Sequence, residues 1–267
     1  MKKKFLKLAL LVAVVPLVSC TAKQIKTTSK KIAPNDRIWH YSMIDAMRRG
    51  IYEGTHTVKE LKGHGDFGLG TFNHLNGELI TLDGIIYRIP PSGKVEVASE
   101  DLKSPFTSLA FFKADLVKTI NFTGNFEDLQ EKILPMLSTQ NLPYAIKIEA
   151  KWSAITVGGA EPISPTDTTE LATLMKARPQ YKSENIKGTM VGYFTPPLLS
   201  NVDLSPFHFH FISDDRTFAG HLMSGQLKNA EIKIYLNEKN GYDVELLRDN
   251  ARFRQLKFES KNASSAY

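Results

Sequence analysis

The apolar positions of this chain recur mostly at every second residue, which is the period of a β-strand. In the second half, this pattern predicts strands over residues 144–150, 188–194, 207–212, 220–223, 230–236 and 242–247. In the first half, three turn dipeptides stand between apolar runs: Asn76-Gly77, Asp83-Gly84 and Ser92-Gly93. Dipeptides of this kind favour tight hairpins, so antiparallel pairing is expected there as well.

Helical periodicity is confined to short stretches. Residues 125–137 repeat apolar side chains at intervals of three and four, as an amphipathic helix does. Shorter helices are predicted over 42–49, with Ser42 as the N-cap, and from the capping pattern that begins at Thr57. Many strands and few helices indicate an α+β fold of strand-rich mixed and antiparallel sheets in two intimately packed halves. The Pro-, Thr- and Gly-rich segment 158–182 is the expected boundary between the halves, or a flap over the active site.

The N-terminus has the pattern of an export signal. It combines lysines at its start with an apolar run that is too short to span a bilayer, and it ends in Leu-Val-Ser before Cys20. This ending resembles the bacterial lipobox, in which the chain is cut before the cysteine and the cysteine receives a lipid. We expect a lipoprotein signal peptide (1–19), a flexible tether (20–36) and a folded domain (37–267) of an exported, membrane-anchored protein. An ordinary secretory signal with an incidental cysteine is the alternative.

Charge gives no indication of a nucleic-acid partner. The whole chain carries 34 basic and 28 acidic side chains, a net charge of +6. Residues 1–19 hold four lysines and no acidic residue, so the rest carries 30 basic and 28 acidic side chains and a net charge of +2. No basic stripe is present, so no nucleic-acid binding is expected. Cys20 is the only cysteine, which excludes a disulfide within the chain.

Three histidines are the main candidates for chemistry. On the strand that the alternation predicts at 207–212, the phenylalanines share one face as core residues, and His208 and His210 share the other. The polar residues 213–216 form the expected turn, after which a second strand could return His221 alongside. Three neutral imidazoles with an open fourth position suit a catalytic zinc or a similar divalent ion. A lone His-x-His pair is more often structural, so spacing alone leaves both interpretations open.

Several sequence blocks together resemble the bacterial alpha-acetolactate decarboxylase family over residues 40–247. These blocks are Tyr-Ser-Met-Ile-Asp-Ala (41–46), Gly-Asp-Phe-Gly-Leu-Gly-Thr-Phe-Asn (65–73), Asn-Gly-Glu (76–78), Lys-Ser-Pro-Phe (103–106), Tyr-Ala-Ile-Lys (144–147), Ile-Lys-Gly-Thr-Met-Val-Gly-Tyr-Phe-Thr-Pro (186–196) and the histidine run. The resemblance implies one zinc, or another divalent metal, on His208, His210 and His221, with Glu78 in the same site. It also implies conversion of 2-acetolactate, a small molecule, to acetoin and CO2 without an organic cofactor.

The implied reaction assigns roles to further side chains. Loss of CO2 leaves an electron pair, for which the neighbouring ketone oxygen is a sink that a metal ion would stabilise. Glu78 is the expected catalytic residue, because a carboxyl group beside the metal could relay the proton that the product needs. Thr71 and Arg216 are expected to contact the substrate, although an ordinary strand threonine and a solvated turn arginine are the more common cases. The oligomeric state stays open, with a homodimer among the possibilities.

The chain departs from the family pattern at two positions. After the Tyr-Ala-Ile-Lys strand the family carries an arginine, and its place here falls on Gly158. The family also has a second functional glutamate near its C-terminus, where this chain offers only Glu259, out of step. Because the arginine is a natural partner for the substrate carboxylate, an active enzyme needs another cation, and the sequence offers Lys151, Arg178 and Arg216. We therefore expect activity that is present but weak.

Two further functions stay open. One is a metal-binding lipoprotein of the same fold with weak or no catalysis, which the two departures favour. The other is a cupin-like metal oxygenase, because His208 and His210 followed by Asp214 echo the first motif of that family. That motif needs a glycine six residues before the first histidine, where this chain has Val202.

Overall fold

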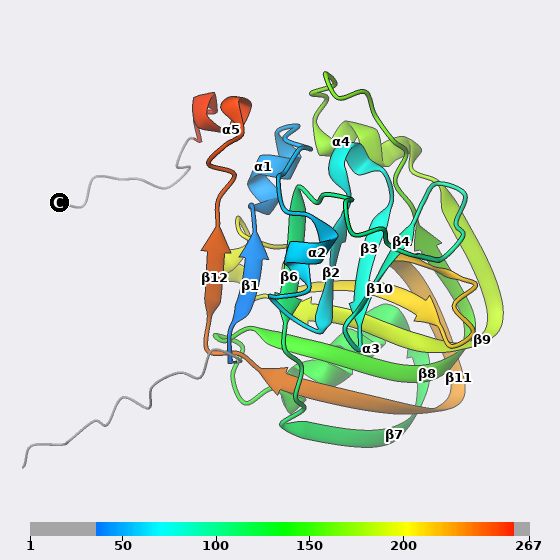
Figure 1. The fold of residues 1–267 in the computed structure, drawn as a ribbon. Helices are drawn as coiled ribbons and strands as arrows, with labels where there is room; N and C mark the ends of the chain where they lie inside the picture. Colours follow the sequence, from blue (N-terminus) through cyan, green and yellow to red (C-terminus); the bar gives the residue numbers. More distant parts are fainter. Residues whose placement is uncertain (1–35, 259–267) are drawn as a thin grey trace, which may run out of the picture. The chain divides into compact units, whose positions relative to one another are not determined.

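Residues 36–258 are described by a computed structural model of the chain, and every structural statement below concerns them (Figure 1). The signal peptide, Cys20 and Glu259 lie outside the described residues. Two β-sheets dominate the structure, and a few short helices lie around them. The predicted α+β class with strand-rich, mixed and antiparallel sheets is confirmed.

The first sheet contains seven strands in the order β12-β1-β6-β2-β3-β4-β5. Neighbours pair antiparallel except β1 and β12, which run parallel. Its strands are β1 (Ile38–Tyr41), β2 (Phe67–Thr71), β3 (Glu78–Leu82), β4 (Ile85–Ile89), β5 (Glu96–Val97), β6 (Phe106–Ala110) and β12 (Tyr242–Glu245). Asp83 and Gly84 join β3 to β4 with φ angles of 53° and 77°. Positive φ at both turn residues is the hairpin geometry that this dipeptide predicts.

The second sheet contains five long antiparallel strands in the order β10-β9-β8-β11-β7. They are β7 (Leu116–Asn125), β8 (Tyr144–Gly158), β9 (Gln180–Phe194), β10 (Phe207–Ser213) and β11 (Ala219–Glu238). The strand β10 also pairs with β11, so β10, β9, β8 and β11 form a closed ring of pairings. The sequence underestimates the length of β8, β9 and β11, and it divides β11 at residues 224–229, where the register shifts at bulges.

The helices are α1 (Ile44–Arg48), α2 (Val58–Leu61), α3 (Phe126–Ile133), α4 (Leu171–Leu174) and α5 (Ala251–Gln255), together with the short 3-10 helices η2 (Asn73–Leu75), η3 (Leu134–Met136), η4 (Met175–Ala177) and η5 (Pro197–Leu199). The predicted cap at Thr57 is confirmed, because its side chain accepts the backbone N–H of Glu60 in a complete capping box. The prediction that Ser42 caps the first helix is wrong. Met43 is the N-cap, and Ser42 is buried with a φ of 74°.

The strand β10 is buried on both faces. Phe209 and Phe211 belong to the apolar cluster of the second sheet, which includes α3. On the opposite face, Ile212 belongs to a second cluster that joins residues of both sheets, such as Ile80 of β3 and Val191 of β9. The histidine-bearing face of β10 is therefore turned toward the first sheet, as the two-residue alternation requires.

The segment between Gly158 and Gln180 connects β8 to β9, two neighbours in the same sheet. The boundary between halves that the sequence places within 158–182 stays a prediction. None of the helices within residues 36–258 is long and apolar enough to cross a membrane.

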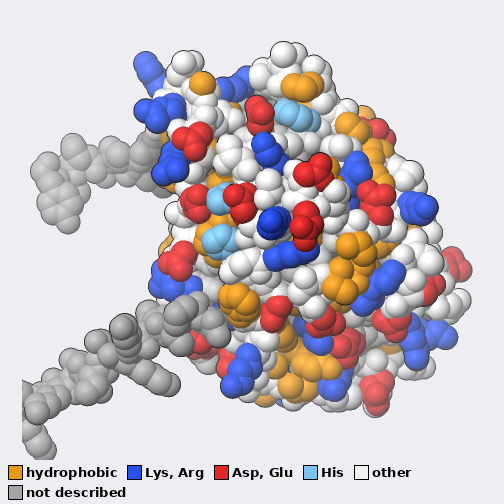
Figure 2. Space-filling view, viewed as in Figure 1, with side chains coloured by type: hydrophobic (Ala, Val, Ile, Leu, Met, Phe, Trp, Pro, Cys, Tyr) orange, Lys and Arg blue, Asp and Glu red, His pale blue; other side chains and the backbone are white. Residues whose placement is uncertain are grey.

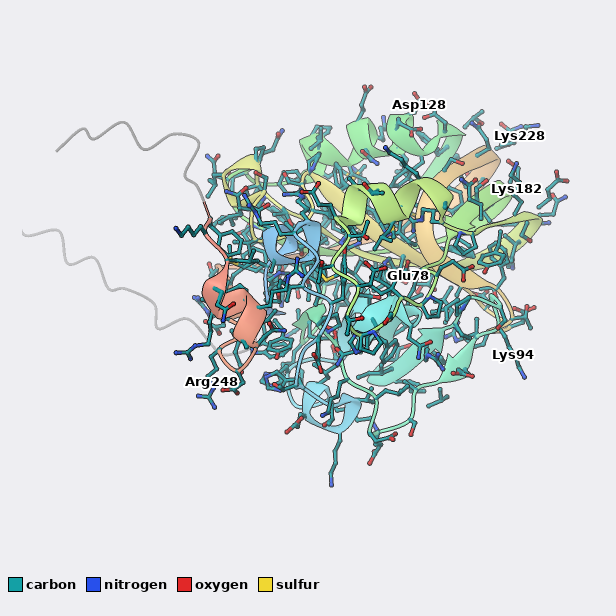
Figure 3. The ribbon with its side chains drawn as sticks, turned by 90° about the horizontal axis from the view of Figure 1, so that it is seen from above. Glu78, Lys94, Asp128, Lys182, Lys228 and Arg248 are labelled. Carbon is teal, nitrogen blue, oxygen red and sulfur yellow. The ribbon has the colours of Figure 1, made fainter. Side chains whose placement is uncertain are left out.

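Charged groups are distributed evenly over the visible surface. Basic and acidic side chains are interspersed on the face shown in Figure 2, without a continuous basic patch. Figure 3 shows Lys94, Asp128, Lys182 and Lys228 at the periphery, whereas Glu78 lies among the central elements. A carboxyl group in the interior is costly unless it has a partner, so Glu78 marks a place where function is expected.

Candidate metal centre

The pairing of β10 with β11 brings the three predicted histidines together. His210 lies directly opposite His221 in the antiparallel register, and His208 precedes His210 by one pleat. The ring centroids are 5.3 Å apart for His208 and His210, 5.1 Å for His208 and His221, and 5.2 Å for His210 and His221. One nitrogen of each ring lies within 4.8 Å of the other two. This triangle matches the donor set of a three-histidine metal site.

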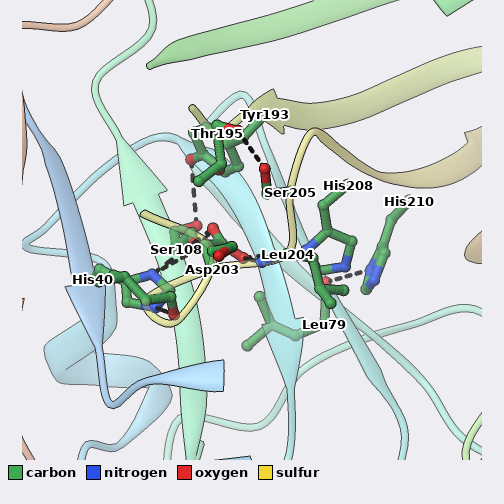
Figure 4. Close-up of polar contacts among 12 residues, drawn as sticks. His40, Leu79, Ser108, Tyr193, Thr195, Asp203, Leu204, Ser205, His208 and His210 are labelled. Atoms are coloured by element: carbon green, nitrogen blue, oxygen red, sulfur yellow. Dashed lines mark hydrogen bonds and ion pairs between the residues drawn. The ribbon is translucent and has the colours of Figure 1, made fainter. Parts of the chain in front are cut away.

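Hydrogen bonds fix two of the imidazole rings (Figure 4). Nδ1 of His210 donates to the backbone carbonyl of Leu79, at 3.0 Å, so its Nε2 carries a free lone pair. Nδ1 of His208 lies 3.5 Å from a carboxylate oxygen of Asp203. In metal sites, the outer ring nitrogen of a ligating histidine almost always bonds a carbonyl or carboxylate in this way.

The protonation of the histidines also suits a metal. Burial lowers the pKa of His210 and of His221 well below the usual value, and the neighbouring His208 lowers both further. Both rings are therefore neutral near pH 7, which is the form that binds a cation. The geometry, the fixed rings and the neutral nitrogens together fit a divalent ion such as zinc.

Behind His208 lies a fully buried polar chain that sequence reasoning missed. Asp203 accepts hydrogen bonds from the hydroxyl of Ser108, at 2.8 Å, and from the backbone N–H of Leu204, at 2.7 Å. Nδ1 of His40 lies 2.7 Å from the same hydroxyl. Burial raises the pKa of Asp203, but hydrogen bonds and the nearby His208 and His40 outweigh it and hold the pKa at about 2. A permanent carboxylate therefore orients His208.

Glu78 reaches the histidines from the first sheet. It is the first residue of β3, and its Oε2 lies 3.8 Å from Nε2 of His210. Burial raises the pKa of Glu78 to about 7, although the guanidinium of Arg178, 3.5 Å from Oε1, acts in the opposite direction. A group with this pKa exchanges protons near neutral pH, as a general acid or base must.

Of the three cations that the sequence offers, the structure places Arg178 beside Glu78. Arg216 lies in the turn between β10 and β11, where it donates to the carbonyl of Ser213 at 2.8 Å and lies 3.4 Å from the hydroxyl of Tyr87. Lys151 is exposed on β8. Neither side chain has a described contact with the three histidines, and substrate contact by Arg216 stays a prediction.

Thr71 lies next to Glu78 in the register of β2 and β3. It is buried, and its hydroxyl donates to the carbonyl of Gly77 at 2.9 Å. In this arrangement the hydroxyl hydrogen stabilises the turn that leads into β3, which is the ordinary structural role of such a residue. Substrate contact by Thr71 stays a prediction.

Fold and site together define a class of protein: an α+β protein with a candidate three-histidine metal centre beside a buried acid. A family model described as Alpha-acetolactate decarboxylase matches residues 38–260. The alpha-acetolactate decarboxylase of Lactococcus lactis subsp. cremoris is 34% identical over 198 residues, which cover 74% of this chain and 83% of that protein. That of Streptococcus thermophilus is 36% identical over 201 residues, with the same coverage of 74% and 83%.

A solved structure of the family is also similar to this chain. The crystal structure of alpha-acetolactate decarboxylase from Bacillus subtilis strain 168 matches with a TM-score of 0.80 and 29% identity, over 84% of this chain and 94% of that one. The chain belongs to the alpha-acetolactate decarboxylase family. Because the chain belongs to this family, the cupin-like interpretation of the histidine spacing is no longer needed.

The role of Asp203 predicts a loss of metal affinity in Asp203→Asn. The substitution keeps the shape and removes the charge behind His208, so the zinc affinity should fall by about 10–100-fold, the range for such outer partners. Competition with a chromophoric chelator measures it. Asp249→Asn, the same change at an exposed ion pair with Arg248, is the control and should bind zinc like the wild type. An affinity of Asp203→Asn within twofold of wild type would show that the carboxylate does not support the site.

The raised pKa of Glu78 predicts a pH-dependent stability of the metal-free protein. The pKa is about 7 in the folded state against 4.5 ordinarily, so the folded state holds this proton more tightly than the unfolded chain. Stability from this group is present below pH 4.5 and is lost as the pH rises to 7. Relative to wild type, Glu78→Gln should gain about 3 kcal/mol of unfolding free energy between about pH 4 and pH 8. Urea unfolding in a chelator measures this, and a pH-independent difference would mean that Glu78 ionises normally.

Proposed function

We propose that the protein decarboxylates 2-acetolactate to acetoin and CO2, with zinc or a similar divalent ion held by His208, His210 and His221. The observation that carries the proposal is the triangle of three histidine rings with the carboxyl of Glu78 3.8 Å from His210, in a chain of this family. A bound divalent ion would supply Lewis acidity toward the hydroxyl and ketone oxygens of acetolactate.

The residues of the chain then have to deliver one proton to the substrate carbon that loses CO2. When the bond to the carboxyl carbon breaks, its electron pair moves toward the neighbouring ketone oxygen and CO2 departs. The carbon that lost the carboxyl group must receive a proton to become acetoin. Glu78 suits this step, because its pKa of about 7 leaves part of the population protonated at neutral pH. Delivery from one fixed carboxyl reaches one face of the planar carbon, so a single acetoin enantiomer is expected.

The alternative of a metal-binding protein with little catalysis has less support from the structure than from the sequence alone. One of its two grounds was a missing cation, and Arg178 supplies a cation beside Glu78. The other ground, the C-terminal glutamate, concerns residues outside the described part of the chain.

We further propose that the protein is exported and anchored to a membrane by a lipid on Cys20. The lysine-rich start, the apolar run and the Leu-Val-Ser-Cys ending support this proposal. An anchored enzyme would meet its substrate at the cell envelope.

The first prediction from this proposal is that purified protein forms acetoin from acetolactate and that a chelator stops the reaction. Zinc should restore it. The variant His208→Ala with His210→Ala should retain neither metal nor activity, because one imidazole cannot hold the ion. Elemental analysis and an acetoin assay measure both properties. Acetoin formation by the double variant at the wild-type rate would refute the proposed role of the histidines.

The second prediction concerns Glu78. Glu78→Gln keeps the size of the side chain and removes the exchangeable proton, so the rate should fall by at least about a hundredfold. Zinc content, measured in the same preparation, should stay near that of the wild type, because the histidines are unchanged. Turnover close to wild type would leave Glu78 without a part in the proton transfer.

The third prediction concerns Cys20. Each buried CH2 of an acyl chain contributes about 0.8 kcal/mol, so two or more chains hold a protein at the membrane essentially permanently. Cys20→Ser should move the protein from the membrane fraction to the soluble fraction, or block its maturation. Mass spectrometry of the mature N-terminus checks the lipid. An unlipidated N-terminus together with unchanged fractionation would instead favour a plain secretory signal.

A further inference from the structure

The guanidinium of Arg178 lies at the candidate site, and not all of its hydrogen-bond donors have a partner there. Arg178 follows η4, and its side chain is only 13% exposed. Its Nη2 lies 3.5 Å from Oε1 of Glu78, which is long for a charged hydrogen bond, normally about 2.7–2.9 Å. Its Nε is buried and has no hydrogen-bond partner among the described residues. Buried donors without a partner are uncommon in native structures, and at a candidate functional site a bound ligand can supply the acceptor.

Gly158 makes room for this guanidinium. A Cβ at Gly158 would lie 2.4 Å from Nε, 2.5 Å from Nη2 and 2.6 Å from Cζ of Arg178, far inside van der Waals contact. Any side chain at this position therefore excludes the present place of the guanidinium. Gly158 on β8 pairs with His221 on β11. The guanidinium that lies against Gly158 is therefore next to the strand position of a candidate metal ligand.

The charges around the site indicate what Arg178 could bind. The three histidines are candidates for a divalent cation, and Glu78 is the acid nearest to the guanidinium in the described contacts. The contact between Glu78 and Arg178 is long, at 3.5 Å, and Nε of Arg178 has no partner among the described residues, so the guanidinium retains a donor for a second anion. A planar guanidinium with free donors matches a carboxylate, which it can bind through two parallel hydrogen bonds.

We propose that Arg178 binds the carboxylate of the substrate and that Gly158 is required for it to do so. The proposal rests on the proposed function, because acetolactate carries a single carboxylate, the group that leaves as CO2. The family resemblance of the sequence implies an arginine at the position of Gly158. In this chain a guanidinium lies against Gly158, but it belongs to Arg178 in the segment that leads into β9. A cation that the resemblance implies on β8 is thus supplied by the connecting segment before β9.

A carboxylate that departs as neutral CO2 loses its charge during the reaction. The guanidinium therefore interacts with the bound substrate at least as strongly as with the later state, so its removal should raise KM and should not lower kcat. Arg178→Gln should raise KM for acetolactate at least about tenfold, the order expected for a lost charge-assisted bond, and change kcat less than about threefold. Arg178→Lys keeps the charge without the planar fork and should fall between the two proteins.

Ligand binding tests the proposal without turnover. The probe is 2,3-dihydroxy-2-methylbutanoate, which keeps the carboxylate and two oxygens of the substrate but has no ketone and cannot decarboxylate. Acetoin is the matched probe without a carboxylate. In calorimetry with zinc-loaded protein, Arg178→Gln should bind the acid at least about tenfold more weakly and bind acetoin within about twofold of wild type. Lys182→Gln, which removes an exposed charge of β9 at the periphery (Figure 3), should bind both like wild type.

An arginine introduced at position 158 on β8 tests whether Arg178 replaces a cation at that position. Gly158→Arg alone should weaken binding of the acid, because its side chain displaces the guanidinium of Arg178. Gly158→Arg combined with Arg178→Gln should bind the acid at least about tenfold more tightly than Arg178→Gln alone. Zinc content of every variant, measured in parallel, should equal that of the wild type.

Three results would overturn the proposal: unchanged affinity of Arg178→Gln for the acid, equal losses for the acid and acetoin, or loss of zinc. A wild type that binds the acid through Arg178 but forms no acetoin would refute the proposed function and leave the carboxylate site standing. Normal acetoin formation with an Arg178-independent affinity would refute only the carboxylate site.

Discussion

The register between β10 and β11 is the constraint on which the site depends. It places His210 opposite His221 and, through the two-residue period, turns His208 to the same face. A slip of one residue would exchange the faces, burying the imidazoles among apolar side chains and turning the phenylalanines into the site. Phe209 and Phe211, both buried in the core of the second sheet, make such a slip costly. Core packing on one face thus fixes the metal geometry on the other.

The same site also requires the first sheet. The carbonyl of Leu79 orients His210, the side chain of Glu78 approaches it, and Ser108 of β6 supports the carboxylate behind His208. None of these contacts exists within one sheet, so the imidazoles are oriented only when both sheets are packed together. The apolar cluster around Ile80 and Val191 provides that packing. Folding and preparation of the site are therefore one event.

The sequence predicts what depends on period and spacing. It foresees the strand faces, the hairpin at Asp83 and the cap at Thr57, because local geometry decides each of them. It misses Asp203, which lies in an irregular segment where no period assigns a direction, and whose partner Ser108 is 95 positions away in the chain. It misplaces the cap at Ser42, because the local preference for serine gives way to a tertiary environment that holds this residue buried with positive φ.

The position of the cation is a second feature that distance along the chain does not predict. Lys151 is nearest to Gly158 along the chain, but seven positions separate them on β8, an odd number that turns the two side chains to opposite faces. Arg178 is twenty residues away, yet β8 and β9 pair from Gly158 and Gln180 onward and bring it alongside. A charge needed at one point can come from a strand or from the connecting segment beside it, provided that the strand leaves the space. Gly158 and Arg178 therefore have to be considered together, because the glycine leaves the space that the guanidinium fills. Position 158 considered alone shows only the absence of an arginine.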